Sequence, residues 1–326
     1  MQLRVGVIGL GMMGKNHARV LSSLEGVELA AFCDPVFQKR EYLGKKVFET
    51  IEEVIAENID YAVVCVPTSE HLMVTRQLAE AGIHCLIEKP ISADLKSARE
   101  IVELFRSSDL KGAIGHIERF NPAVVEARKR LDSIGEIFQI STRRQGPFPG
   151  RISDVGVVKD LATHDFDLTA WLTGSPYSEV YARVANKSGR THEDLVAVTA
   201  QLRTGVIANH LVNWISPQKD RCIVLIGEKG SFQIDTLNAD LVFSKNGEIQ
   251  TEWSDIARFR GVSEGDVIRY SFVKKEPLQL EHEEFRNAIL DKQNSSASLE
   301  DGLHAVMVAE AVIDSARSLQ SVRITP

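Results

Sequence analysis

Three glycines near the start of the chain have the spacing of a phosphate-binding turn. Gly9, Gly11 and Gly14 form the pattern G-x-G-x-x-G directly after the apolar run Leu3–Ile8. The first glycine allows a tight turn, the second lets the backbone approach a pyrophosphate, and the third allows a helix to pack closely on a strand. The helix that follows would direct free backbone N–H groups at the phosphates. The pattern therefore predicts a dinucleotide-binding site.

An acidic residue follows at the distance expected for such a site. Asp34 ends a second apolar run, Val27–Cys33, and lies 20 residues after Gly14. A carboxylate there can accept hydrogen bonds from a ribose 2′-OH and would repel a 2′-phosphate, so NAD is favoured over NADP. Lys39 and Arg40 lie near enough to leave NADP open as the less favoured alternative.

Other predicted strands also end in residues that could contact this cofactor. In an open parallel sheet, ligands bind beyond the carboxyl ends of the strands. The further residues expected to contact the cofactor lie within the glycine turn or after the apolar runs 60–66 and 83–87: Met12, Met13, Pro67, Thr68, His71, Glu88 and Lys89. His116, at the end of a later predicted strand, is also expected near this edge.

Lys89 is the first candidate for a catalytic role. It lies in the segment Glu88-Lys89-Pro90 at the end of a predicted strand. An ammonium group in that position, near a nicotinamide ring, could donate or accept a proton. The alternative is a surface lysine that pairs with Glu88.

Asp160 and His164 form the second candidate group. They lie four residues apart in a segment with a helical pattern, so their side chains would share one helix face. A carboxylate that accepts a hydrogen bond from one imidazole nitrogen fixes the tautomer and leaves the other nitrogen as a base. The alternative is an Asp–His pair without a catalytic role.

Arginines at strand ends are candidates for binding an anionic substrate. Arg143 and Arg144 end a predicted strand and are followed by a loop that reaches Arg151, while Arg119 follows His116. Guanidinium groups suit phosphate and carboxylate ligands, and ordinary surface charge is the alternative. No Cys and His residues cluster with the spacing of a zinc site, so we expect no metal.

The order of the predicted elements places the first part of the chain in the α/β class. Strands at 3–8, 27–33, 60–66, 83–87 and 111–116 alternate with helices at 15–23, 50–58, 69–81 and 94–107. Such alternation predicts parallel βαβ units in a doubly wound Rossmann sheet. We place this NAD(P)-binding domain at residues 1–119.

Strands dominate the rest of the chain. They are predicted at 136–144, 177–185, 195–203, 206–214, 221–226, 231–235 and 241–244, with helices at 121–131, 160–173, 278–290 and 298–319. The dipeptide Thr204-Gly205 between two strands indicates a hairpin. Residues 120–326 are therefore predicted to form an α+β domain with a mostly antiparallel open sheet, for substrate binding and oligomerisation. We expect the last helix to pack back on the first domain.

Composition excludes several classes of partner. The 326 residues are 44% hydrophobic and 25% charged, and 38 basic against 45 acidic residues give a net charge of −7. This balance is typical of a soluble domain and argues against nucleic acid or an anionic membrane as the main partner. No secretory signal or membrane-spanning run is visible. The four cysteines have no metal-like spacing and indicate buried thiols in a reducing cytoplasm.

Taken together, these segments resemble the glucose–fructose oxidoreductase, inositol dehydrogenase and rhizopine catabolism (Gfo/Idh/MocA) family. The resemblance covers nearly the whole chain and rests on the opening VGVIGLGMMGKNHARVL, Asp34-Pro35, residues 67–71, Glu88-Lys89-Pro90, residues 160–165 and residues 298–317. It implies an NAD(P)-dependent dehydrogenase that acts on CH–OH groups. By this resemblance Lys89 supports the nicotinamide and the reacting hydroxyl, and His164, paired with Asp160, is the general base.

A narrower resemblance concerns the substrate. Residues 115–122, Arg143, Gly146-Pro147 and the segment from Asp154 to Val158 look like the UDP-N-acetylglucosamine 3-dehydrogenases. This implies oxidation at C3 of a UDP-N-acetylhexosamine, with Arg119 and Arg143 facing the diphosphate. Lys159 stands where many relatives have an apolar residue, so it would be a further ligand for an anionic substrate or would perturb Asp160.

Other functions stay open on the sequence alone. The substrate could be a free polyol or aldose, such as inositol or glucose. An NAD-dependent glycosidase would use hydride transfer transiently and release sugar without net NADH. A non-catalytic NAD-binding protein and a structural accessory subunit are the remaining alternatives. Because an antiparallel sheet often leaves one face exposed, we also expect a homodimer or homotetramer.

Overall fold

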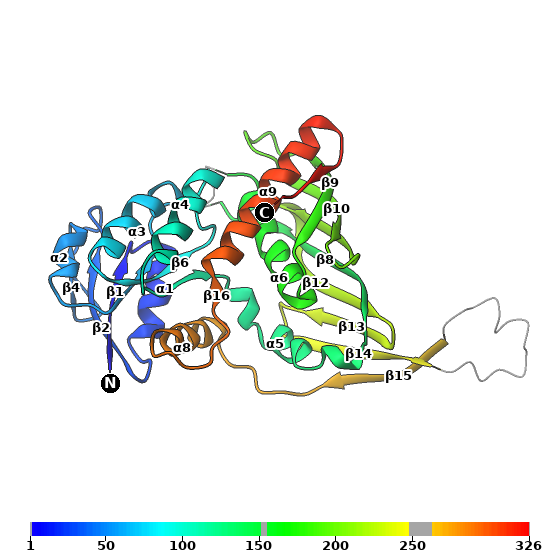
Figure 1. The fold of residues 1–326 in the computed structure, drawn as a ribbon, viewed down its shortest axis with the longest axis horizontal. Coiled ribbons are helices and arrows are strands. Elements are labelled where there is room, and N and C mark those ends of the chain that lie inside the picture. The colour runs from blue at the N-terminus through cyan, green and yellow to red at the C-terminus, as the bar shows by residue number, and fades with distance from the viewer. Residues whose placement is uncertain (1, 151–154, 248–262, 326) are drawn as a thin grey trace, which may run out of the picture. The chain divides into compact units, whose positions relative to one another are not determined.

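The computed structural model describes residues 2–150, 155–247 and 263–325 (Figure 1). The chain divides into two compact units. The first comprises Met1–Phe120 and Lys275–Met307, and the second comprises Asn121–Lys274 and Val308–Pro326. The sequence-based boundary at 119/120 lies one residue from the first of these divisions. The prediction grouped residues 120–326, whereas the structure returns Lys275–Met307 to the first unit.

The first unit is built on an eight-stranded sheet, which confirms the predicted Rossmann architecture. The strand order is β16-β7-β6-β5-β1-β2-β4-β3. The strands are β1 (Leu3–Ile8), β2 (Val27–Cys33), β3 (Glu41–Tyr42), β4 (Lys45–Phe48), β5 (Tyr61–Val64), β6 (His84–Glu88), β7 (Gly112–Gly115) and β16 (Ala297–Ser298). Pairing is parallel except at the two short edge strands, β3 and β16. The order reverses at β1, with β2 on one side and β5 on the other, and this reversal marks where a ligand binds in such sheets.

Helices cover both faces of this sheet. Successive residues of a strand point to opposite faces, so each face has its own apolar core. Val64 belongs to the core under α2 (Ile51–Ile55), α3 (His71–Glu80) and α4 (Leu95–Arg106). Val63, one residue earlier, belongs to the core under α1 (Met12–Leu21) and α8 (Pro277–Ile289). Within the described ranges, no helix has both the length and the apolar character needed to cross a membrane.

The second unit is built on a nine-stranded, mostly antiparallel sheet, as predicted. The order is β15-β14-β13-β12-β8-β11-β10-β9-β17, and the pair β8–β11 is parallel. The strands are β8 (Ile137–Pro147), β9 (Tyr177–Ala185), β10 (Leu195–Leu202), β11 (Ile207–Asn213), β12 (Ile215–Gly227), β13 (Gly230–Asp235), β14 (Asp240–Gly247), β15 (Ser263–Tyr270) and β17 (Val322–Arg323). The helices are α5 (Pro122–Arg128), α6 (Thr163–Thr173) and the end of α9 (Leu299–Ser318), which begins in the first unit.

One face of the second sheet is covered and the other is open. Along β10, Val196, Val198 and Ala200 are buried, whereas Ala197 and Thr199 are exposed. This alternation is typical of an antiparallel sheet with one face packed on a core. Helix α6 packs on the covered face, where it contacts β8.

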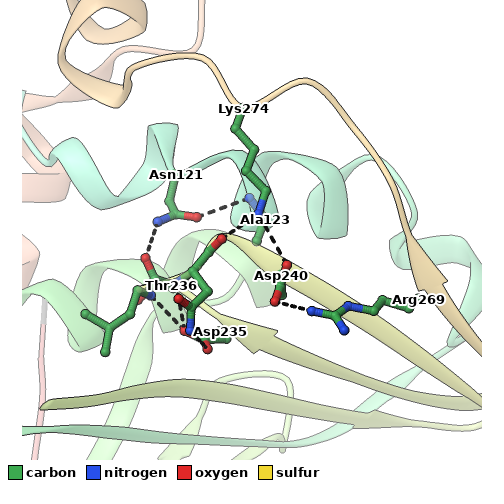
Figure 2. Close-up of polar contacts among 9 residues, drawn as sticks. Asn121, Ala123, Asp235, Thr236, Asp240, Arg269 and Lys274 are labelled. Carbon is green, nitrogen blue, oxygen red and sulfur yellow. Dashed lines mark hydrogen bonds and ion pairs between the residues drawn. The ribbon is translucent and has the colours of Figure 1, made fainter. Parts of the chain in front are cut away.

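Polar contacts join α5 to the far strands of this sheet (Figure 2). The Asn121 side chain caps the first turn of α5 and donates to the Thr236 carbonyl oxygen at 2.8 Å. The Lys274 ammonium donates to the Asn238 carbonyl oxygen at 2.6 Å and pairs with Asp240 at 3.3 Å. These contacts link the start of the second unit to the β13–β14 turn and to the segment that leaves the unit.

Breaking the buried ion pair between Arg144 and Asp165 should destabilise the second unit. Arg144 Nε lies 3.1 Å from both carboxylate oxygens, and the two side chains are 2% and 1% exposed. Because Asp165→Asn removes a counter-charge from a buried guanidinium, we expect a loss of about 3–5 kcal/mol in the free energy of unfolding, measured by urea denaturation. Asp240→Asn is the control, since its ion pairs with Lys274 and Arg269 lie at the surface. Equal losses in both variants would contradict this account.

Candidate functional site

The glycine turn after β1 has the geometry of a phosphate cradle. Gly9 has φ +94°, and a Cβ atom there would lie 2.6 Å from the Cys65 carbonyl oxygen. A Cβ atom at Gly14 would lie 1.9 Å from the Gly9 carbonyl oxygen, so only glycine fits at both positions. At Gly11, by contrast, a Cβ atom would meet nothing within 4 Å. The open space at Gly11 faces the start of α1, whose first turn carries no acidic residue, and this fits a bound pyrophosphate.

Asp34 lies at the end of β2 and is tied to the same turn. Its Oδ2 accepts a hydrogen bond from the Leu10 N–H at 2.7 Å, and its Oδ1 accepts one from the Val36 N–H at 3.0 Å. Each carboxylate oxygen has a second lone pair, which leaves both able to bind ribose hydroxyls. Arg40, one of the two cations considered for a 2′-phosphate, pairs with Glu49 at 3.3 Å. The arrangement therefore suits NAD.

Glu88 and Lys89 lie where β6 ends. Glu88 Oε2 accepts a hydrogen bond from the Lys89 backbone N–H at 3.0 Å, and Oε1 lies 2.9 Å from His17 Nε2. Burial by itself would raise the pKa of Glu88, but the hydrogen bond and charge of His17 and the proximity of Lys89 lower that pKa overall. Glu88 is therefore a carboxylate anion at neutral pH. It orients Lys89 through the backbone as well as by charge.

His71 connects the loops that follow β5 and β6. Its side chain is 1% exposed, with Nδ1 3.2 Å from the Ile91 carbonyl oxygen and Nε2 3.1 Å from the Val66 carbonyl oxygen. Burial lowers the pKa of His71. Pro67 and Thr68, in the loop after β5, are more accessible, so direct contact with the cofactor stays a prediction for these three residues.

Asp160 and His164 belong to the second unit, in a segment that differs from the predicted continuous helix. A π-helical turn, Val158–Ala162, contains Asp160 and precedes α6, in which His164 is the second residue. Asp160 is buried and His164 is half-buried, and both take part in polar or electrostatic interactions. Single π-helical turns are frequent at functional sites because they change the direction in which side chains point.

Glu193 is a site residue that the sequence reasoning missed. Its carbonyl oxygen accepts a hydrogen bond from the Val157 N–H at 3.0 Å, and its Oε1 accepts one from the Val158 N–H at 3.2 Å. Gly156 leaves room for this carboxylate, since a Cβ atom there would lie 1.9 Å from Glu193 Oε1. Glu193 thus holds the start of the turn that carries Asp160. The sequence gives no signal that Glu193 belongs to the site, because no motif or spacing relates it to Gly156.

Arg143 lies on the face of the second sheet opposite to its neighbour. Arg144 points to the covered face and binds Asp165 of α6, so strand alternation directs Arg143 to the open face. Arg143 pairs there with Asp220 at 2.9 Å and lines a cavity of about 460 Å³ with Tyr181. Within one chain, Arg143 and the helix that carries His164 are therefore on opposite sides of the sheet. Contact between Arg143 and the substrate stays a prediction.

The two other predicted anion ligands have carboxylate partners. Arg119 is 4% exposed and pairs with Asp301 at 3.1 Å within the first unit. Lys159 pairs with Glu310 at 2.7 Å within the second unit. Both cations therefore already have a counter-charge. Arg151 and Asp154, also noted in the sequence, lie outside the described residues.

The predicted site residues thus fall into two groups. The first unit holds the glycine turn, Asp34 and Lys89, and the second unit holds Asp160 and His164. In the part of the chain that the structure describes, no three His, Cys, Asp or Glu side chains are grouped to hold a metal ion. The four cysteines are free thiols, and burial raises the pKa of Cys33 to about 12.

Alanine substitutions at two of the glycines should have separable effects. Gly11→Ala should keep the thermal stability, because its φ of −64° suits alanine, but it should weaken NAD binding by filling the open space with a methyl group. Gly14→Ala should cost about 1–3 kcal/mol of stability through overpacking against the Gly9 carbonyl. Thermal melts of the apoprotein and fluorescence titrations with NAD measure the two effects. Wild-type NAD affinity in Gly11→Ala would contradict this assignment.

Comparisons with known proteins agree with this geometry. Residues 3–116 match the model of the oxidoreductase family with an NAD-binding Rossmann fold, and residues 124–233 match the GFO/IDH/MocA C-terminal domain. The chain is 29% identical to a UDP-N-acetylglucosamine 3-dehydrogenase of Acidithiobacillus ferrooxidans, over 88% of each chain. A solved structure of that enzyme matches with a TM-score of 0.84 at 27% identity, over 98% of this chain and 99% of the other.

An inositol 2-dehydrogenase of Corynebacterium glutamicum is 30% identical, over 65% of this chain and 67% of the relative. The fold is also that of a scyllo-inositol dehydrogenase from Lactobacillus casei with bound NAD(H) and scyllo-inositol, with a TM-score of 0.81 at 22% identity over 99% of both chains. The glycine turn, Asp34 and both family models therefore lead to one conclusion: the chain is an NAD-binding oxidoreductase of the Gfo/Idh/MocA family.

Proposed function

We propose that this enzyme oxidises a secondary hydroxyl of a sugar, at C3 of a UDP-N-acetylhexosamine. The observation that supports this substrate best is the extent of the match. The UDP-N-acetylglucosamine 3-dehydrogenase aligns over 88% of both chains, whereas the inositol 2-dehydrogenase of similar identity aligns over 65% of this one. The structural match to the former covers 98% of this chain at 27% identity.

The proposed chemistry divides the work between cofactor and protein. Bound NAD supplies the acceptor for the hydride that leaves the sugar carbon. His164 would take the hydroxyl proton as general base, and Asp160 would fix its tautomer. The Lys89 ammonium would stabilise negative charge that develops on the hydroxyl oxygen. The chain thus binds, orients and moves a proton, while positioning lowers the entropic part of the barrier.

Lys159 would bind the anionic part of the substrate. It precedes Asp160 and pairs with Glu310 at 2.7 Å. A diphosphate would have to compete with Glu310 for its ammonium group. Arg119 is left out because its side chain is buried against Asp301.

A homo-oligomer in the cytoplasm is part of the same proposal. Tyr181, Ile207 and Leu211 lie on one face of the second sheet and are each about 40% exposed. A second copy packed on this face would remove these apolar side chains from water. The free thiols of the described chain are in keeping with a reducing compartment.

Removal of either catalytic group should abolish most turnover. With a UDP-N-acetylhexosamine as substrate, His164→Ala and Lys89→Met should each lower kcat by roughly 10²–10⁴-fold, because each removes a proton-transfer or charge-stabilising group. Affinity for NAD should be retained in His164→Ala. Lys96→Met removes an exposed lysine of α4 and is the control, with wild-type kcat expected. Wild-type turnover in His164→Ala would refute its assignment as the base.

A substrate panel separates this proposal from its alternatives. We expect NADH formation, followed at 340 nm, to be fastest with UDP-N-acetylglucosamine or a close relative. Turnover only with inositols or glucose would replace the nucleotide sugar by a free polyol or aldose. Release of free sugar without net NADH would indicate a glycosidase. Binding of NAD without turnover of any panel member would favour a non-catalytic role.

A further inference from the structure

A chain of buried polar groups runs beneath the glycine turn and is not used in the chemistry above. His282 Nε2 of α8 lies 2.8 Å from His17 Nδ1 of α1. His17 Nε2 lies 2.9 Å from Glu88 Oε1 at the end of β6. Both histidines are 0% exposed, and the neighbouring Glu281 is 2% exposed. Three elements of the first unit that are far apart in sequence are therefore joined through His17.

One hydrogen-bond role in this chain is fixed by chemistry. The Glu88 carboxylate can only accept, so His17 Nε2 carries a hydrogen and donates it. The 2.8 Å contact between His17 Nδ1 and His282 Nε2 shares a second hydrogen between the two rings. Burial, followed by the charge of His17, lowers the pKa of His282 well below its ordinary value. The chain therefore donates to Glu88 through His17.

The two carboxyl groups of the cluster differ in charge. Glu88 accepts hydrogen bonds on both oxygens, from His17 and from the Lys89 N–H. Neither oxygen of Glu281 has a hydrogen-bond partner among the described residues. Burial, and then the negative charge of Glu88, raise the pKa of Glu281 well above its ordinary value. The cluster therefore holds one carboxylate charge, and that charge is on Glu88.

Three other titratable groups lie near Glu88, and none of them is a carboxylate. The Lys89 ammonium is close enough to act on it, as is the buried His71 ring. The Cys65 thiol lies near both Glu88 and Glu281, and burial raises its pKa well above the ordinary value. Glu88 is thus the carboxylate at the end of β6 that accepts hydrogen bonds from both His17 and the Lys89 N–H.

The sheet order places this charge on the nicotinamide side of the cofactor. Asp34 at the end of β2 suits the adenosine ribose, and the turn after β1 suits the pyrophosphate. The strand order β6-β5-β1-β2 then puts the other half of the dinucleotide toward β5 and β6. The nicotinamide ring is a cation in NAD⁺ and is neutral in NADH, so a fixed anion distinguishes the two.

We propose that the Glu88 carboxylate, held in place by the His282–His17 chain, makes the site prefer oxidised over reduced cofactor. The inference rests on the proposed use of NAD as hydride acceptor. In the direction of sugar oxidation, the Glu88 charge would make the site bind NAD⁺ more tightly and release the product NADH more readily. Glu88 and the two histidines are positioning and charge-setting residues, with no contact to the sugar.

The test compares dissociation constants for NAD⁺ and NADH in the absence of any sugar. Glu88→Gln keeps the size of the side chain and removes its charge, so its preference for NAD⁺ over NADH should fall by about tenfold. Glu281→Gln is the matched control, because it changes the other buried carboxyl group, whose pKa burial and the charge of Glu88 raise and whose oxygens make no hydrogen bond among the described residues, and it should leave the preference unchanged. Fluorescence titration at pH 7.5 on the full chain gives both constants.

A second variant tests the same inference if Glu88→Gln does not fold. His17→Phe keeps a ring but removes the donor to Glu88, so the pKa of Glu88 should rise. The preference for NAD⁺ should then be kept at high pH and lost as the pH falls, whereas the wild type keeps it over the same range. An unchanged preference in Glu88→Gln, or an equal loss in Glu281→Gln, would overturn the proposal.

The outcomes also separate this inference from the proposed function. If the wild type binds NAD⁺ and NADH with the preference described but oxidises no sugar, the proposed function fails and the role of Glu88 stands. If it oxidises the sugar while Glu88→Gln keeps the wild-type preference, the role of Glu88 fails and the function stands.

Discussion

The close approach of α1 to the turn after β1 is the constraint on which the cofactor site depends. A Cβ atom at Gly14 would lie 1.9 Å from the Gly9 carbonyl oxygen, so helix and turn are in contact through bare backbone. That contact directs the first turn of α1 at the space beside Gly11. It also places His17, one turn further along, within hydrogen-bond distance of Glu88. Phosphate binding and control of the Glu88 charge therefore derive from the same piece of packing.

Carboxylates that accept backbone N–H groups hold each part of the site. Asp34 accepts from Leu10 in the glycine turn, Glu88 accepts from Lys89, and Glu193 accepts from Val158 before the π-helical turn. A charge-assisted hydrogen bond to backbone fixes a loop more firmly than packing alone. In all three cases the carboxylate orients the main chain. The main chain in turn positions the group proposed to act on a ligand: the glycine turn, Lys89 or Asp160.

Local patterns predicted the elements of this fold well. The observed bounds of β1, β2 and β9 equal the predicted ones, because apolar runs ended by Gly, Asp or a polar loop leave little choice of register. The π-helical turn at Val158–Ala162 was not predicted, since its hydrogen bonds depend on Glu193 from a distant strand connection. The sequence predicts that the last helix packs on the first domain, but it has no local signal that α8 also belongs to the first unit.

Side-chain partners were the least predictable part of the site. The sequence could not show that Arg143 and Arg144 take opposite roles, because that follows from which face of β8 is covered by α6. The sequence predicts Lys159 as a ligand for an anionic substrate or as a charge that perturbs Asp160, but it could not show that Glu310 lies 2.7 Å from its ammonium group. His17 and His282 have no partner at a suggestive spacing in the sequence, yet they contact each other across 265 residues. Contacts of this range depend on the tertiary fold and leave no spacing to read.

In the proposed reaction a hydride passes from C3 of a UDP-N-acetylhexosamine to NAD. The most direct measurement is mass spectrometry of the cofactor recovered after incubation with UDP-N-acetylglucosamine deuterated at C3. The account predicts reduced cofactor that carries the deuterium label. Reduced cofactor without the label would show that another carbon is oxidised, and no reduced cofactor at all would contradict the claim.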